Sequence, residues 1–320
     1  MKIKQLAKVL GLGALALTLG ACGQAAGDTK AAEASVGVLQ FMEHESLDRA
    51  REGFTDALKE AGYEEGKNLT LNYQNAQGDQ SNLQSITQQL AGKNDLILSI
   101  ATPAAQAMLN TDKKTPQLFT AVTDPVSAKL VDTAEKPGAN MTGTSDGAPT
   151  DKVVDLLLKA DPSIKTIGIL YNSSEVNSEM QYKEAKDYIE SKGLKVESMT
   201  VTTTNEIQQA TKALAKKVDG IYLPTDNTVA NTIQTIGQVL KEEKVPSVAA
   251  FDAGVEGALC AYGVDYYELG KQTGEMALDI LKNGKTPAEM PVQKSEKLVV
   301  KVNDDMAKAL GIDPKSLTEE

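Results

Sequence analysis

Apolar and polar residues follow two repeated patterns along the chain: short apolar runs, and longer stretches with an apolar residue every three or four positions. The first pattern is typical of buried strands and the second of amphipathic helices. The pattern predicts strands at 36–41, 68–73, 95–100 and 117–122. Between them it predicts a helix at 46–61, a helical face at 83–90 and a helix that begins at 103.

The same alternation resumes after Pro149. Strands are expected at 166–171, 194–201, 220–223 and 247–251, with helical faces at 153–158, 180–189, 207–214 and 229–240. A helix at 266–281, a strand at 297–302 and a helix from residue 303 follow. Alternating strands and helices predict parallel sheets with helices on both faces. Two such runs, separated by a segment rich in Gly, Ser, Thr, Asp and Pro at 143–149, predict two similar lobes.

The first residues have the features of an export signal. Lys2, Lys4 and Lys8 precede an apolar run at 9–19, which is shorter than the about 20 residues of a membrane span. The run ends at Leu19-Gly20-Ala21-Cys22, which resembles the lipobox of bacterial lipoproteins, where the Cys becomes the lipid-bearing N-terminus. The alternative is an ordinary secretory signal with a chance Cys.

We therefore expect a lipoprotein signal peptide at 1–21, a lipid on Cys22 and a flexible, small and polar tether at 22–35. The protein would be anchored by its lipid to the extracytoplasmic face of the cell membrane.

Charge and composition exclude several classes of protein. The net charge of −11 becomes −14 once the three lysines of the signal are removed, which argues against a nucleic-acid partner. The sequence has a single histidine, His44, so it offers no multi-histidine metal site and no histidine-paired acid–base relay. Cys260 stands in an apolar run and is expected to be a small buried hydrophobe. We expect no enzyme activity, no cofactor and no metal.

Polar residues follow the carboxyl ends of the predicted strands, where ligands of open parallel sheets bind. Each of them could equally cap a helix, but a series that converges on one edge of each lobe favours a ligand site. The candidates are Glu43, His44, Thr102, Thr123, Asp124, Asn172, Glu175, Asn177, Asp226, Asn227 and Asp252.

Thr102 and Pro103 predict a helix start, with Thr102 at the N-cap. The free N–H groups of that helix would hold the carboxylate of an amino acid. Asp226, Asp252 or Asp146 would meet its ammonium group. Phe41 and Met42, with His44, would supply the surface for the ligand side chain.

Several strings resemble one known family, the ABC-transporter substrate-binding lipoproteins that include tryptophan- and tyrosine-binding members. They lie at 41–48 (Phe-Met-Glu-His-Glu-Ser-Leu-Asp), 75–79, 121–126, 137–146, 171–178, 224–227 and 263–270, and the last of them adds Asp265 to the candidate site. Together the strings cover nearly the whole mature chain. Glu45 departs from the pattern, because relatives often carry Pro there.

The resemblance implies an α/β, type I periplasmic-binding-protein fold, with two doubly wound parallel-sheet lobes joined by three crossovers. The N-terminal lobe would comprise 36–145 plus 265–284, and the C-terminal lobe 146–264 plus 285–320. An aromatic amino acid, tryptophan or tyrosine, would close the cleft between them and pass to an ABC permease and its ATPase, and we expect a monomer. The alternatives are another small solute (a nucleoside, a sugar or another amino acid) and a surface adhesion or signalling lipoprotein.

Overall fold

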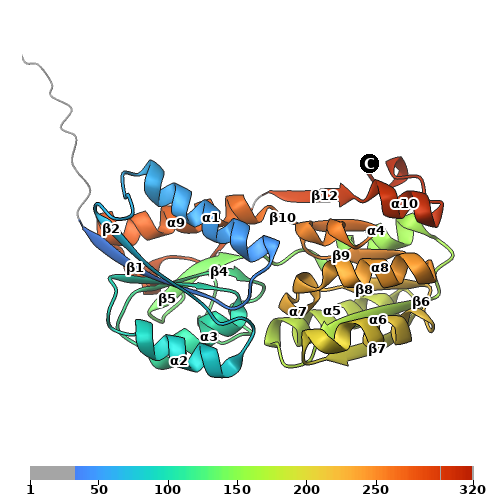
Figure 1. Ribbon diagram of the computed structural model, residues 1–320, viewed down its shortest axis with the longest axis horizontal. Coiled ribbons are helices and arrows are strands. Elements are labelled where there is room, and N and C mark those ends of the chain that lie inside the picture. Colours follow the sequence, from blue (N-terminus) through green and yellow to red (C-terminus); the bar gives the residue numbers. More distant parts are fainter. Residues whose placement is uncertain (1–32, 296, 319–320) are drawn as a thin grey trace, which may run out of the picture. The chain divides into compact units, whose positions relative to one another are not determined.

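The computed structural model describes residues 33–295 and 297–318. Its first sheet is parallel throughout, in the order β11-β5-β4-β3-β1-β2 (Figure 1). The strands are β1 (Ala34–Gln40), β2 (Leu69–Asn75), β3 (Leu96–Ile100), β4 (Gln117–Val122), β5 (Met141–Ser145) and β11 (Gln293–Lys294). Helices α1 (Glu45–Glu60) and α9 (Tyr266–Asn283) cover one face, and α2 (Gln80–Leu90) and α3 (Thr102–Thr111) the other.

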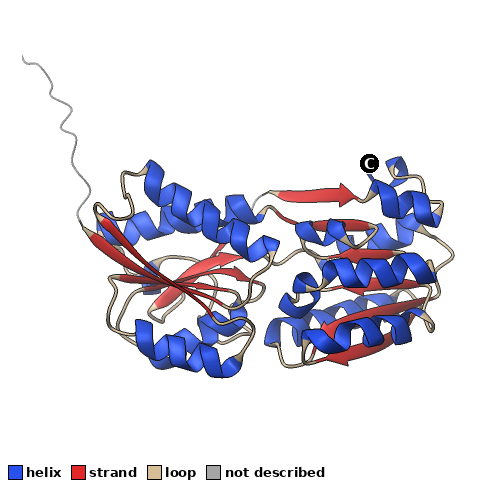
Figure 2. Cartoon of the chain, in the orientation of Figure 1, coloured by secondary structure: helices blue, strands red, loops and turns tan. Residues whose placement is uncertain are grey.

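The second sheet has the order β12-β10-β9-β8-β6-β7, in which only β12 runs antiparallel to its neighbour (Figure 2). Its strands are β6 (Thr166–Asn172), β7 (Lys195–Val201), β8 (Gly220–Leu223), β9 (Ser247–Ala249), β10 (Cys260–Val264) and β12 (Leu298–Val302). Its helices are α4 (Thr150–Ala160), α5 (Val176–Ser191), α6 (Ile207–Ala215), α7 (Asn227–Asn231), α8 (Ile233–Glu243), α10 (Asp304–Leu310) and α11 (Lys315–Thr318).

Short 3-10 turns complete the chain at η1 (Thr204–Glu206), η2 (Asp252–Glu256) and η3 (Pro287–Glu289). None of the helices within the described residues is both long and apolar enough to cross a membrane.

Burial explains why the central strands form. Every residue of β3, β4 and β5 is buried, as is expected of parallel strands covered by helices on both faces. The edge strands β2 and β7 leave several side chains exposed. Cys260 is free and buried in β10, as the apolar run around it predicted.

Helix α9 packs on α1 although it follows the second run of strands. A Cβ atom on Gly270 would lie 1.9 Å from the backbone oxygen of Ala50, and one on Gly53 would lie 2.0 Å from that of Tyr267. The two helices therefore touch backbone to backbone at positions where only glycine fits. This contact holds the late helix against the first sheet.

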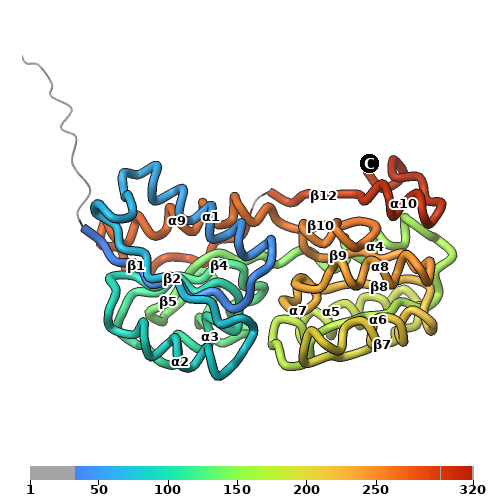
Figure 3. The backbone as a smooth tube through the Cα atoms, in the orientation of Figure 1, coloured from blue at the N-terminus to red at the C-terminus, as the bar shows by residue number. Residues whose placement is uncertain are grey.

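The chain passes between the two sheets three times: after β5, after β10, and between β11 and β12 (Figure 3). In each sheet the first strand of the run lies between the second and the third, which is the doubly wound order. Two such lobes with three crossovers confirm the type I periplasmic-binding-protein fold class.

The structure differs from the expected organisation in three places. Residues 141–145 form β5 and residues 260–264 form β10, and neither strand was expected. The expected interlobe segment at 143–149 overlaps the end of β5. Strand β11, expected in the second lobe as part of 285–320, pairs instead with β5 of the first sheet.

The buried hydroxyl groups of β5 explain why periodicity missed this strand. Thr144 Oγ1 bonds Thr120 Oγ1 at 3.0 Å and Thr273 Oγ1 at 2.7 Å, and Thr142 Oγ1 donates to the Met290 carbonyl at 2.7 Å. Because its polar side chains are satisfied inside the core, β5 needs no run of apolar residues.

Candidate ligand-binding site

A small cavity lies where the carboxyl ends of strands from both sheets meet. The first lobe contributes His44, Ser46, Leu47, Ala121 and Thr123 to its lining. The second contributes Asn177, Thr225, Asp226, Asn227, Ala230 and Phe251, and the crossovers contribute Asp146 and Tyr266.

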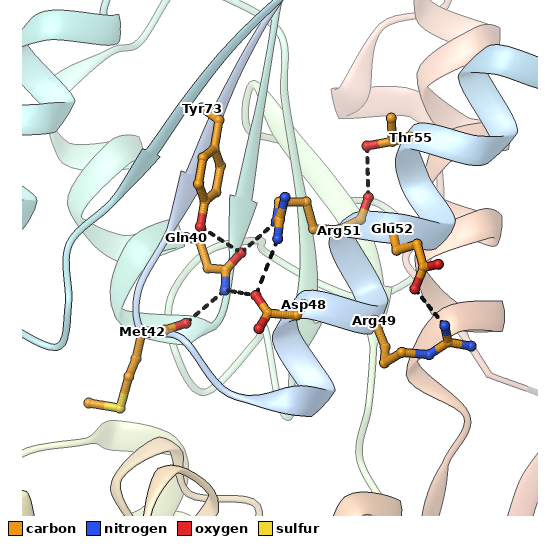
Figure 4. Close-up of polar contacts among 8 residues, drawn as sticks. All are labelled: Gln40, Met42, Asp48, Arg49, Arg51, Glu52, Thr55 and Tyr73. Carbon is orange, nitrogen blue, oxygen red and sulfur yellow. Dashed lines mark hydrogen bonds and ion pairs between the residues drawn. The ribbon is translucent and has the colours of Figure 1, made fainter.

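The loop between β1 and α1 carries the first group, and a buried amide fixes it. Gln40 donates through Nε2 to the Met42 carbonyl and to Asp48 Oδ1, both at 2.8 Å (Figure 4). Its Oε1 accepts from Arg51 Nε at 3.1 Å, and the Arg51 guanidinium lies over the Tyr73 ring at 4.5 Å. The loop and the first turn of α1 are thus tied to the end of β1.

His44 reaches from this loop to the second lobe. Its Nε2 lies 3.3 Å from Asn227 Oδ1. The Asn227 amide nitrogen donates to Glu175 Oε2, so its oxygen faces the imidazole and Nε2 carries the proton. His44 Nδ1 is then an acceptor, and it is buried with no hydrogen-bond partner among the described residues. Burial lowers the pKa of His44 to about 4, against the opposing effects of Asn227 and Asp48.

Two buried carboxyl groups of the second lobe support Asn227. Asp226 caps α7 through Oδ1, which accepts from the Val229 N–H at 2.9 Å, while Oδ2 accepts from the Asn172 N–H at 2.6 Å. Burial raises the pKa of Asp226, and these hydrogen bonds oppose the shift. Burial and the nearby Asp226 carboxyl raise the pKa of Glu175. Each carboxyl group is therefore more readily protonated than it would be in water, and a cation beside it would oppose that shift.

Asp146 stands at the first crossover. Its Oδ2 accepts from the Tyr266 hydroxyl at 2.7 Å, and its Oδ1 is buried with no hydrogen bond to a described residue. Burial raises the pKa of Asp146, while the Tyr266 and Thr123 hydroxyls oppose the shift. The Oδ1 atom of Asn177, which also lines the cavity, is likewise buried and unpaired within the described chain.

The first sheet also holds an unusual backbone at this edge. Gln77 after β2, Ala101 after β3 and Ala121 in β4 have φ angles of 54°, 82° and 56°, a region that non-glycine residues rarely occupy. At Ala121 the register between β4 and β5 shifts. Such local strain is concentrated at functional edges of folds, and here it marks the edge that faces the cavity.

The structure sorts the sequence candidates into groups. His44, Thr123, Asp146, Asn177, Asp226 and Asn227 line the cavity. Glu175 lies behind it, bonded to Asn227. Phe41, Met42, Glu43 and Asn172 line a second, more open hollow that also contains Gly78 and the threonines at 202–204.

Four candidates line neither hollow and have local roles. Asp124 accepts from the N–H groups of Val126 and Ser127, and Asp265 caps α9. Asp252 pairs with Lys301 Nζ at 2.9 Å. Thr102 was expected at the N-cap of its helix, but Ala101 occupies that position and Thr102 is buried in the first turn.

Sequence reasoning missed the residues that come from helix starts and from the end of β9. Ser46 and Leu47, in the first turn of α1, belong to the string at 41–48 and therefore had a signal that was not used. Tyr266 directly follows the candidate Asp265 at the second crossover, and Phe251 ends the strand predicted at 247–251. Their position next to candidates was the signal that could have found them.

Comparison with known proteins agrees with this geometry. The family model for ABC transporter substrate binding proteins matches residues 35–317. A tyrosine-binding protein of Clostridioides difficile (strain R20291) is 41% identical over 278 residues, which is 86% of this chain and 80% of that protein.

Two solved structures differ in how well they superpose. The ABC domain from Streptococcus pneumonia in complex with L-Trp is 40% identical, with a TM-score of 0.85 over 90% of this chain and 98% of that chain. The ligand-free, open structure of a substrate-binding protein with adhesive properties from Clostridium difficile is 45% identical, with a TM-score of 0.68 over 88% and 95%. Higher identity accompanies the lower TM-score, so the difference between the two matches lies in conformation rather than in sequence. The chain belongs to the family of ABC transporter substrate-binding proteins.

Proposed function

We propose that this protein captures an aromatic amino acid, tryptophan or tyrosine, between its two lobes and delivers it to an ABC permease without catalysing a reaction. The names of its relatives support the ligand class: one is a tyrosine-binding protein and another was solved with L-Trp. A capture role agrees with the polar groups of the cavity, which are placed to hold a ligand.

The observation that carries the proposal is a set of unpaired acceptors. His44 Nδ1, Asp146 Oδ1 and Asn177 Oδ1 are all buried, line one cavity and lack a hydrogen bond to any described residue. A buried polar atom without a partner costs about 1–3 kcal/mol, so a ligand that donates to it gains that energy. An ammonium group brings three N–H donors and a positive charge.

The charge of the lining agrees with a cationic group on the ligand. Asp146 and Asp226 line the cavity and Glu175 lies behind it, while the residues described as its lining include no Lys and no Arg. Phe251 and Tyr266 supply ring surface inside the cavity, and Phe41 and Met42 supply apolar surface in the adjoining hollow. Aromatic rings pack well against such surfaces.

Calorimetry with Asp146→Asn tests the proposal. The substitution keeps the size of the side chain and removes the charge that would meet the ammonium, so binding of L-tryptophan or L-tyrosine should weaken by about 3 kcal/mol, or about a hundredfold. Asp279→Asn is the matched control, because Asp279 pairs with Lys285 at 2.8 Å outside the cavity, and the substitution should leave the affinity unchanged. The proposal fails if neither amino acid binds the unaltered protein, or if the two variants behave alike.

The moving parts in this proposal are the two lobes. We assign 36–145 with 265–294 to the first and 146–264 with 298–318 to the second, following the sheet to which each strand belongs. The functional protein would be a monomer that works with a permease and an ATPase.

We also propose that a lipid on Cys22 holds the protein at the extracytoplasmic face of the membrane. Cys22 lies outside the described residues, and the sequence Leu19-Gly20-Ala21-Cys22 supports this part of the proposal. Cys22→Ala should move the protein from the membrane fraction to the soluble fraction. Sedimentation of both forms with membranes, with no lipid found on either by mass spectrometry, would contradict an anchor at this residue.

A further inference from the structure

We infer that the first turn of α1 binds the carboxylate of the ligand, with the backbone N–H groups of Ser46 and Leu47 and the Ser46 hydroxyl as donors. This inference rests on the proposed function, because it assigns the second charged end of the same amino acid. It moves the carboxylate from α3, where the sequence suggested it, to a different helix.

The start of α1 has free donors. The helix is 16 residues long, and the side chain of its N-cap residue, His44, makes no capping hydrogen bond. The first bond back to His44 comes from the Asp48 N–H at 3.0 Å. No described residue accepts from the N–H groups of Ser46 and Leu47, and both residues line the cavity. Helix starts of this kind bind anions through free N–H groups and the positive end of the helix dipole.

A second observation points to a ligand at the same place. Ser46 is 2% exposed, and its hydroxyl is buried without a partner among the described residues. A buried hydroxyl is normally hydrogen-bonded, since leaving it unpaired costs stability. A carboxylate at the start of α1 would accept from it.

The rest of the cavity leaves the carboxylate few other partners. Its described lining has no Lys or Arg, and Asp146 and Asn177 present acceptors, which repel a carboxylate. Glu45, although it is in the same turn, does not line the cavity, and its carboxyl group is bonded to Glu256. The donors of α1 and the acceptors of Asp146 and Asn177 thus suit the two ends of a zwitterion.

The donors are also held in place. The bonds of Gln40 to Met42 and Asp48 fix the turn that leads into α1, as Figure 4 shows. Arg51, one turn further along the helix, closes the network through Gln40 Oε1. A binding group whose support is rigid loses little entropy when the ligand arrives.

Calorimetry with two serine variants and two forms of each ligand tests the inference. In Ser46→Ala, binding of free L-tryptophan or L-tyrosine should weaken about tenfold or more, because a hydrogen bond to a charged group is lost. The same substitution should leave the affinity for tryptamine or tyramine, which lack the carboxylate, nearly unchanged. Ser99→Ala is the matched control, since the Ser99 hydroxyl in β3 is equally buried and unpaired but lies outside the cavity, and its affinity should equal that of the unaltered protein.

The unaltered protein gives an independent measurement that needs no variant. It should bind the free acid more tightly than the amide, tryptamine or tyramine. If these amines bind as well as the free acid, or if Ser46→Ala matches Ser99→Ala, the carboxylate assignment is wrong while the proposed amine capture stands. If no aromatic amino acid binds the unaltered protein, the proposed function fails and this inference with it.

Discussion

His44 connects the two lobes through one side chain. Its Nε2 meets Asn227 of the second lobe, its Nδ1 faces the cavity, and burial keeps the ring neutral. A neutral imidazole accepts a hydrogen bond from an ammonium, whereas an imidazolium would repel it. Acceptance of a hydrogen bond by His44 Nδ1 therefore depends on the pKa of His44, which burial holds below its ordinary value.

The charge state of His44 can be measured directly, because the chain has no other histidine. Its imidazole signals in an NMR titration should change with a midpoint at about 4 rather than 6.5. Since the less buried state binds more protons between these values, the arrangement that buries His44 should lose stability as pH falls from 6.5 towards 4. A midpoint near 6.5 in the ligand-bound protein would contradict the buried, neutral ring.

At this scale the sequence predicted part of the cavity lining. It indicated His44 and Asp226 because they follow predicted strands, and Asp146 because it lies in the segment between the two lobes. It gave Asp252 the same weight as these residues. The sequence does not show that Asp252 forms an ion pair with Lys301, which lies 49 residues further along the chain. Local sequence shows which residue type follows a strand, but not which distant side chain already pairs with it.

Helix α1 of the first lobe and the 3-10 turn η2 of the second lobe contact each other through two glutamate side chains. The Glu45 carboxyl group in the first turn of α1 forms a hydrogen bond with that of Glu256 in η2, and both residues line a hollow next to the cavity. That bond, burial and the charges of Glu256 and Asp252 raise the pKa of Glu45 to about 7, while Lys301 opposes the shift.

The contact between α1 and η2 should therefore depend on pH. When Glu45 and Glu256 are in contact, Glu45 keeps its proton up to a pH of about 7, whereas a separated Glu45 loses its proton above a pH of about 4.5. The stabilising contribution of Glu45 to the contact is therefore fully present below pH 4.5 and is lost as pH rises through about 7. The ratio of ligand affinities between unaltered protein and Glu45→Gln should rise as pH falls from 8 to 5. Taking the ratio removes the opposite effect of His44.

Glu52→Gln is the control for this prediction, because Glu52 is on the same helix and pairs with Arg49 at its surface. It should leave the pH profile of the unaltered protein intact. Parallel profiles for Glu45→Gln and the unaltered protein would show that the acid pair does not act on closure.

Element prediction succeeded where packing is simple. The strands at 117–122 and 220–223 were placed correctly, because each is fully buried and most of its residues are apolar. Periodicity failed at β5, whose threonines satisfy their hydroxyls with Thr120, Thr273 and Met290. Those partners lie up to 148 residues away, so the burial of β5 follows from the assembled fold rather than from local sequence.

For the whole molecule, direct polar links join the two lobes at the cleft within the described chain. His44 meets Asn227, Asn231 Nδ2 donates to the Glu43 carbonyl at 2.7 Å, and Glu45 meets Glu256. Closure needs differential affinity of the ligand for the closed arrangement. An amino acid held by α1 on one side and by Asn177 on the other would supply it.

Small-angle X-ray scattering should therefore give a smaller radius of gyration with saturating L-tryptophan or L-tyrosine than without ligand. The two relatives agree with such a motion, since this chain superposes at a TM-score of 0.85 on the L-Trp complex and at 0.68 on the ligand-free, open structure. A scattering curve that stays unchanged while calorimetry reports binding would count against a closing cleft.

The three crossovers have a consequence for synthesis and export. The first sheet is completed by β11 at 293–294, and its helix layer by α9, which packs closely on α1 at Gly53 and Gly270. A chain that emerges from its N-terminus can therefore complete its first lobe only after almost every residue has been made. Long-range pairing of this kind slows folding. We expect the nascent chain to stay unfolded for most of its translation, which is the condition that a narrow secretion channel requires of its cargo.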